Sequence, residues 1–223
     1  ERGILFLSTP FDEQSADLLN DLHIAAFKIP SGEITNLPFL KYVARFGKPM
    51  IISTGMATLS EVSNAVGTVH QAGNGFTAVL HCVSNYPTAS EDVNLRSMEM
   101  LRVFKSPVGF SDHTLGIEIP LAAVALGADI IEKHFTLDRS LPGPDHRASL
   151  EPDELAALVA GIRKVEAALG ERMKRPGPRE KEVAAVVRKS LVAACDIKEG
   201  TRITAEMIAI KRPGTGLSPA LYD

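Results

Sequence analysis

Short apolar segments alternate with helical segments through residue 169, and each apolar segment ends in a polar or glycine-rich turn. Their apolarity is continuous rather than alternating, which indicates strands covered on both faces and therefore a parallel sheet. Consecutive strands are about 20–30 residues apart, a spacing that fits either an open doubly wound sheet or a (β/α)8 barrel. The expected strands are residues 3–8, 25–29, 50–53, 77–82, 108–110 and 129–132.

Helical periodicity and capping residues predict helices between these strands. We expect Asp12 and Ser60 to act as N-caps, and Gly47, Gly127 and Gly170 to lie just beyond the ends of three helices. The expected helices are residues 13–21, 37–46, 61–71, 95–104, 116–126 and 152–169.

Residues 107–149 predict a strand–helix–strand unit with a histidine just beyond each strand. Because the carboxyl ends of parallel strands share one edge of a sheet, His113 and His134 should face the same crevice. Two imidazoles at matching depth suit a divalent metal. A histidine at a strand end can also serve only as a hydrogen-bonding residue. The pairing, with Asp145 following closely, favours the metal.

Polar side chains also follow the other expected strands. Serines beside glycines offer the hydroxyls and accessible amides that bind phosphate at helix N-termini. Lys28 supplies a cation for an anionic substrate, and a lysine ending an apolar strand needs a partner. With the histidines, these groups predict a metal-assisted reaction on a small phosphorylated anion. The candidates are Lys28, Ser31, Glu33, Ser53, Ser84, Tyr86, Ser111, Glu132 and Asp145.

Each candidate also has a purely structural interpretation. A serine before a helix is commonly only an N-cap. Glu132 and Lys133 could form a local ion pair, and Tyr86 could belong only to a turn. We interpret three further histidines as structural, namely His23, His70 and His81.

The composition is that of a globular protein without a basic surface for nucleic acid. The chain has 223 residues, 45% hydrophobic and 23% charged, with a formal net charge of -3. No apolar run is long enough to span a bilayer. Cys82 and Cys195 lie in apolar runs and are expected to be buried free thiols rather than a disulfide, as in the reducing cytoplasm.

Composition also predicts the domain organisation. Residues 1–169 form the α/β domain, residues 170–185 a charged, proline-containing linker, and residues 186–223 the start of a small β-rich domain. Its expected strands are residues 189–195, 197–199 and 207–211. The chain enters directly into an apolar run without an initiator methionine, which suggests a fragment; alone, it is expected to be inactive and poorly stable.

Seven motifs occur in order: STPFD, KIPSGE, STGM, HCVSNYP, GFSDHT, EKHFTLD and GPDHRASLEP. Together they resemble the sialic acid synthase family, which includes spore-coat polysaccharide synthases and makers of related nonulosonic acids. The tail, with KSLVA and KRPG, resembles the start of the antifreeze-like SAF domain that follows the barrel in that family.

The resemblance implies an α/β fold, a (β/α)8 TIM barrel lacking its first two βα units in this chain, followed by a truncated SAF domain. It implies a transferase that condenses phosphoenolpyruvate with N-acetylmannosamine or a related amino sugar and releases phosphate. The alternatives are another phosphoenolpyruvate-using or aldolase-type barrel enzyme, or a non-catalytic barrel fragment. The resemblance does not specify the amino sugar.

Site roles follow from the same resemblance. His113 and His134 match the ligands of a catalytic Mn2+, with Mg2+ or Co2+ as alternatives, and Asp145 matches an acid that reaches the metal through water. Phosphoenolpyruvate-binding positions are matched by Lys28, Ser31, Ser53 and Ser111.

Further positions in the resemblance concern the sugar. Glu33 and Tyr86 match positions near the sugar and the reacting centre, and Glu33 could act as a base. Ser84 stands where many relatives have asparagine. Arg212 matches an arginine inserted into the partner subunit's active site, which implies a domain-swapped homodimer in the cytoplasm.

Overall fold

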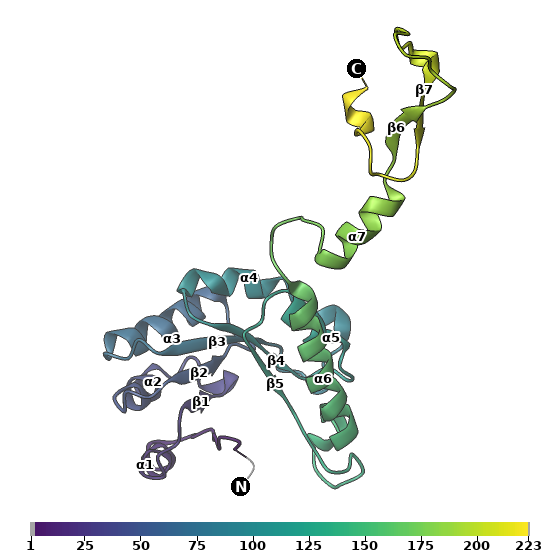
Figure 1. Cartoon of the computed structure of the whole chain (residues 1–223). Coiled ribbons are helices and arrows are strands. Elements are labelled where there is room, and N and C mark those ends of the chain that lie inside the picture. Colours follow the sequence, from purple (N-terminus) through teal and green to yellow (C-terminus); the bar gives the residue numbers. More distant parts are fainter. Residues whose placement is uncertain (1–2, 223) are drawn as a thin grey trace. The chain divides into compact units, whose positions relative to one another are not determined.

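The computed structural model describes residues 3–222, and the chain divides after Gly170 into two compact units. The first unit holds a five-stranded parallel sheet whose strands lie in chain order (Figure 1). A doubly wound sheet reverses its strand order at a switch point, and this sheet does not. Right-handed crossovers that step in one direction place the helices on one face, as in half of a barrel. The strands are β1 (Phe27–Ile29), β2 (Met50–Ser53), β3 (Thr77–Cys82), β4 (Val108–Asp112) and β5 (Ile130–Lys133).

The helices between the strands agree with the sequence pattern except at some of their ends. They are α1 (Glu13–Asp21), α2 (Leu37–Ala44), α3 (Leu59–Gln71), α4 (Ser97–Leu101), α5 (Glu118–Ala125) and α6 (Pro152–Leu169). The predicted N-cap Ser60 is wrong. Thr58 caps α3 and forms a capping box with Glu61, because each satisfies a backbone N–H of the other. The segment predicted as a helix over 95–104 forms α4 and a short 3₁₀ turn at Arg102–Phe104.

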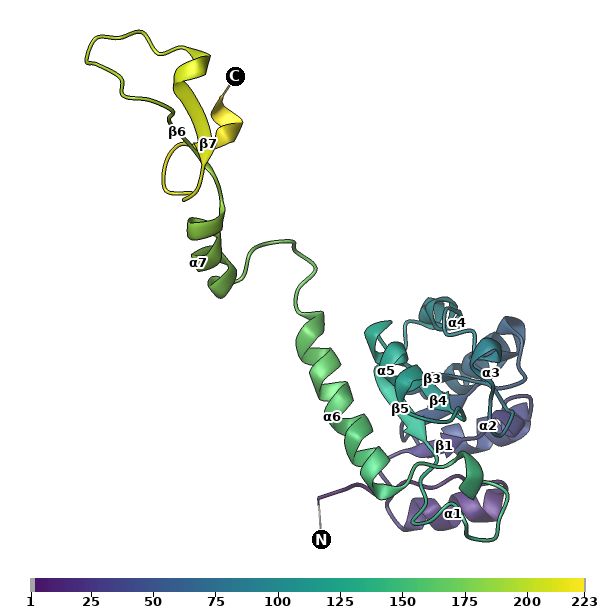
Figure 2. The same cartoon turned by 90° about the vertical axis from the view of Figure 1, so that its right-hand side faces the viewer.

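The hydrophobic core lies between the sheet and these helices (Figure 2). Phe27, Met50, Val79 and Phe110 alternate along the strands with residues of the opposite face and are almost fully buried against helix side chains. In α3 the helical spacing brings one apolar stripe to this core: Val62, Ala65, Val66 and Val69.

The face of the sheet opposite the core is concave. Lys28 of β1 and Glu132 of β5 form an ion pair with 3.5 Å between Nζ and Oε1. A flat sheet would separate these two strands by about 19 Å, so the sheet must curl to bring the side chains together. Gly109 of β4 permits this curl. A Cβ at that position would lie 2.5 Å from the Ile130 carbonyl oxygen and from Leu80 Cδ2.

Two expectations are wrong, one for the start of the first unit and one for the burial of the cysteines. Residues 3–8 form no continuous strand; only Ser8 forms a bridge, with Phe27, and the side chains of Ile4, Leu5 and Phe6 are exposed because no described residue packs over them. Both cysteines are free, as expected, but only Cys82 is buried. Cys195 is exposed because it lies in a bend after the last residue of a strand in the second unit.

The second unit contains helix α7 (Pro178–Val187) and an antiparallel pair, β6 (Ser190–Ala193) and β7 (Ile208–Lys211). The second half of the predicted linker is helical, and Pro178 begins this helix at its favoured first-turn position. The segment predicted as a strand at 197–199 is irregular. Among the described residues, no helix combines the length and apolar character that crossing a bilayer requires.

Candidate active site

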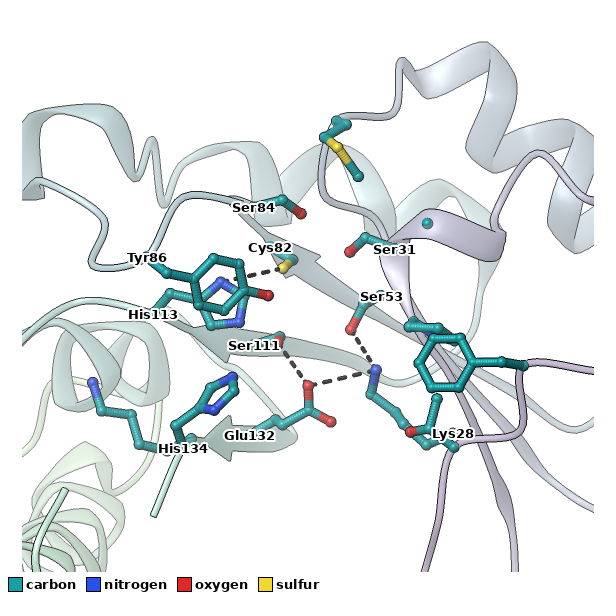
Figure 3. A pocket seen from close by; sticks show the side chains of 16 residues that line it. Lys28, Ser31, Ser53, Cys82, Ser84, Tyr86, Ser111, His113, Glu132 and His134 are labelled. Atoms are coloured by element: carbon teal, nitrogen blue, oxygen red, sulfur yellow. Dashed lines mark hydrogen bonds and ion pairs between the residues drawn. The ribbon is translucent and has the colours of Figure 1, made fainter. Parts of the chain in front are cut away.

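A cavity of about 680 Å³ opens at the carboxyl ends of the five parallel strands (Figure 3). It is the place where ligands bind in barrel-type α/β folds. Nine of the sequence-predicted candidates line it: Lys28, Ser31, Ser53, Ser84, Tyr86, Ser111, His113, Glu132 and His134. The sequence therefore predicted most of the wall of this cavity.

Lys28 provides a cation on the β1–β2 side of the cavity. Its ammonium donates to Ser53 Oγ at 2.8 Å and to the Ile29 carbonyl at 3.1 Å, and pairs with Glu132. Glu132 in turn accepts a hydrogen bond from Ser111 Oγ at 2.7 Å. Figure 3 shows this chain of contacts crossing the cavity floor between its two sides. The lysine predicted to need a partner has one, on the far strand.

Two serine hydroxyls converge over Gly55, just beyond β2. The backbone N–H of Gly55 donates to Ser31 Oγ at 2.9 Å. A Cβ at Gly55 would lie 2.8 Å from Ser31 Oγ and would collide with Ser84 Oγ. Glycine is therefore required for both hydroxyls to approach this turn, which leaves a small polar subsite beside Lys28.

The pairing of β4 with β5 places the two histidines side by side. Ser111 lies opposite Glu132, and Asp112 opposite Lys133, so the next residues are His113 and His134. Side chains alternate along a strand, which directs both imidazoles to the cavity with Ser111 and Glu132. The ring centroids are 5.2 Å apart.

The ring of His113 has a defined orientation. Its Nδ1 lies 2.7 Å from the Val83 carbonyl oxygen, which can only accept, so Nδ1 carries a proton and Nε2 is the nitrogen that the neutral ring offers to a metal. The Tyr86 ring lies over it, with 4.0 Å between centroids. Burial alone would lower the pKa of His113, but hydrogen bonds with Cys82 and Val83 outweigh that effect and raise the pKa.

The donor set fits a divalent metal that keeps most of its coordination positions open. Burial lowers the pKa of His134, and the nearby charge of His113 lowers it further, which favours the neutral imidazole that metals bind. Within residues 3–222, no group of three or more His, Cys, Asp or Glu side chains is arranged to hold a metal. The two imidazoles would thus leave positions for water and substrate oxygen.

Three predicted site residues lie outside the cavity wall. Asp145 precedes a short 3₁₀ turn, His146–Ala148, and its charge influences the pKa values of His134 and Tyr86 without lining the cavity. Glu33 is half-buried and accepts a hydrogen bond from Asn36 at 2.7 Å. Arg212 is exposed in the second unit.

The structure adds Cys82 to the predicted wall, and the candidate Glu132 lies on it as well. Cys82 lies opposite Ser111 in the strand register, with its Sγ 3.9 Å from His113 Nδ1. Both residues end an expected strand on the face that the predicted serine and histidine share. The alternation of side chains along each strand could therefore have identified Cys82 from the sequence, as it did Glu132.

Both units of the chain are similar to known proteins. Residues 1–174 match the NeuB family, and residues 188–223 match the SAF domain. The chain is 50% identical to the N,N'-diacetyllegionaminic acid synthase of Campylobacter jejuni, over 99% of this chain and 67% of that protein. It is also 50% identical to the enzyme of the same name from Legionella pneumophila, over 98% of this chain and 63% of that protein.

A solved structure shares the fold. The N-acetylneuraminic acid synthetase of Leptospira borgpetersenii, crystallised with citrate, aligns with a TM-score of 0.76 at 41% identity, covering 81% of this chain and 63% of that one. The chain thus spans roughly two thirds of the length of these proteins.

Proposed function

The chain belongs to the NeuB family, and on that basis we propose that it is part of a nonulosonic acid synthase that condenses phosphoenolpyruvate with an amino sugar and releases phosphate. One observation carries this proposal: a lysine with serine hydroxyls faces a pair of imidazoles across a single cavity. The first side suits a small phosphorylated anion, and the second suits a metal that binds an aldehyde oxygen.

The anion side would hold phosphoenolpyruvate. Lys28 and Ser53 already contact each other and would grip its charged groups, while Ser31 and Ser84 converge beside them. In the free protein, the carboxylate of Glu132 partly neutralises the ammonium of Lys28. An arriving anion would therefore compete with this carboxylate for the ammonium, which favours a dianionic or trianionic substrate over a weakly charged one.

The imidazole side would hold Mn2+, with Mg2+ or Co2+ as alternatives, through His113 and His134. When bound, such an ion polarises a carbonyl as a Lewis acid. The protein's own contribution is to orient the ring of His113 through Val83, to pack Tyr86 over that ring, and to lower the pKa of His134 by burial.

The chemistry would begin with attack of phosphoenolpyruvate C3 on the sugar's aldehyde carbon. Holding both reactants in one cavity replaces a bimolecular encounter by a near-attack arrangement. Water then adds at C2, and phosphate leaves by cleavage of its C–O bond. Glu33 and Glu132 are the carboxylates that we propose to accept the proton of this water, since Glu132 lies on the cavity wall and Glu33 just outside it.

The names of the relatives suggest the acceptor. Both relatives at 50% identity are called N,N'-diacetyllegionaminic acid synthases. Phosphoenolpyruvate contains no nitrogen, so both acetamido groups of such a product must come from the sugar. We therefore propose a diacetamido sugar as the preferred acceptor.

A phosphate-release assay tests this function in the full-length protein. With phosphoenolpyruvate and Mn2+, we expect phosphate release that depends on an amino sugar and is fastest with a diacetamido sugar from a panel that includes N-acetylmannosamine. Chelation of the metal should abolish it. A product formed from both substrates without phosphate release would instead identify an aldolase-type enzyme, and no turnover of any sugar would contradict the proposal.

Arg212 provides a test of the proposed domain-swapped homodimer. Arg212→Ala should raise the KM for the sugar far more than the KM for phosphoenolpyruvate, because the resemblance places this arginine over the acceptor in the partner subunit. The matched control is Arg202→Ala, another exposed arginine of the same unit. An unchanged sugar KM in the Arg212 variant would exclude this role.

A further inference from the structure

We propose that Asp112 and Lys133 are positioning residues that set His134 relative to His113. Lys133 contributes to the cavity wall, but its ammonium is paired with Asp112. The inference rests on the proposed metal site, and neither residue needs to touch metal or substrate. Each immediately precedes one of the two histidines. The alternation that turns the histidines toward the cavity turns Asp112 and Lys133 the other way.

The two residues form a closed network around the backbone of His113. Lys133 Nζ lies 2.7 Å from Asp112 Oδ2 and also donates to the Thr114 carbonyl. Asp112 Oδ1 accepts the Thr114 backbone N–H at 2.8 Å. The residues on both sides of His113 are thus tied to the residue before His134.

Because the network is buried, water cannot replace its contacts. The side chains of Lys133 and Asp112 are 3% and 0% exposed. A buried charge must keep its partner, since water cannot substitute for it. The pair therefore permits one relative position of the ends of β4 and β5, whereas apolar side chains would tolerate several.

His134 depends on this network more than His113 does. Val83 orients the ring of His113 directly, but within residues 3–222 no side-chain hydrogen bond orients the ring of His134. Strand β5 is half-buried along its whole length. At this end the backbone is held by the buried Lys133 side chain and by the Leu150 N–H, which donates to the His134 carbonyl at 2.9 Å. The Lys133 network is therefore the side-chain contact that fixes where the His134 ring starts.

The test measures Mn2+ affinity of the full-length protein by calorimetry, with phosphoenolpyruvate affinity and thermal stability measured on the same samples. Lys133→Met should weaken Mn2+ binding about 10- to 100-fold, the usual effect of removing a residue that orients a metal ligand. Phosphoenolpyruvate affinity should stay near that of the wild type, because Lys28 and the Gly55 turn lie on other strands.

Two further variants separate positioning from stability. Leu40→Ala, in the core of α2, should lower stability without weakening Mn2+ binding. The double variant Asp112→Leu/Lys133→Met removes both charges together, a replacement that commonly preserves folding, and should still bind Mn2+ weakly. It keeps the test decisive if Lys133→Met alone does not fold.

The outcomes are distinguishable. Wild-type Mn2+ affinity in a folded double variant, or in Lys133→Met, would overturn the positioning role and leave the proposed function intact. Failure of the wild-type protein to bind Mn2+ would overturn the metal site and this inference with it.

Discussion

His113→Ala is expected to lower kcat/KM by a factor on the order of 10³ in the full-length enzyme. The Lewis acid that this histidine would hold contributes several kcal/mol of transition-state stabilisation. Alanine also removes the ring against which Tyr86 packs. The measurement is phosphate release at saturating phosphoenolpyruvate across a range of Mn2+ concentrations, with metal content determined on the same protein.

The matched control is His70→Ala, which makes the same substitution at an exposed position on α3. It should retain wild-type turnover and metal content. A His113→Ala protein that turns over normally with full metal occupancy would show that this residue is not a ligand.

Lys28→Met is expected to raise the KM for phosphoenolpyruvate about 10- to 150-fold, which corresponds to the loss of a hydrogen bond to a charged group, about 1.5–3 kcal/mol. Methionine keeps much of the side chain's volume but supplies no charge. It also leaves the carboxylate of Glu132 facing the anionic substrate without its cation. The affinity for phosphoenolpyruvate is measured with and without Mn2+, which distinguishes the loss of the lysine from an effect on the metal site.

Lys48→Met is the control for this prediction. Lys48 lies in the same unit, and its ammonium donates to the Asn20 carbonyl at 3.2 Å rather than to any residue of the cavity. Its substitution should leave the KM unchanged. Equal phosphoenolpyruvate affinity in wild type and Lys28→Met would show that Lys28 does not bind the anion.

The histidine pair was predictable because it depends on local rules. Continuous apolar runs indicated parallel strands, and parallel strands share one edge at their carboxyl ends. The positions of His113 and His134 just beyond two consecutive strands followed from the sequence alone. The register of β4 with β5 then confirms that they are neighbours.

The partner of Lys28 was not predictable in the same way. The sequence suggested a local pair between Glu132 and Lys133, and that suggestion is wrong because adjacent strand residues point to opposite faces. Glu132 instead contacts Lys28, and Lys133 contacts Asp112. Pairing Glu132 with Lys28 requires knowing the curvature of the whole sheet, which no local pattern specifies.

The first residue of a helix is difficult to predict where two neighbouring residues can both act as its N-cap. Ser60 and Thr58 are both capable N-caps, and Glu61 decides between them because it stands three residues after Thr58. In the second unit, the charged composition that indicated a linker also contains good helix formers after Pro178. Composition alone did not distinguish these two outcomes.

The curled sheet has a consequence for how related enzymes can diverge. Contacts among Lys28, Glu132 and Ser111 cross the cavity from β1 to β5, so the strands set the spacing between the lysine side and the imidazole side of the cavity. Loops beyond the strand ends are then free to vary with the acceptor. Relatives named for different products, legionaminic and neuraminic acids, could share one bond-forming geometry while their loops select the sugar.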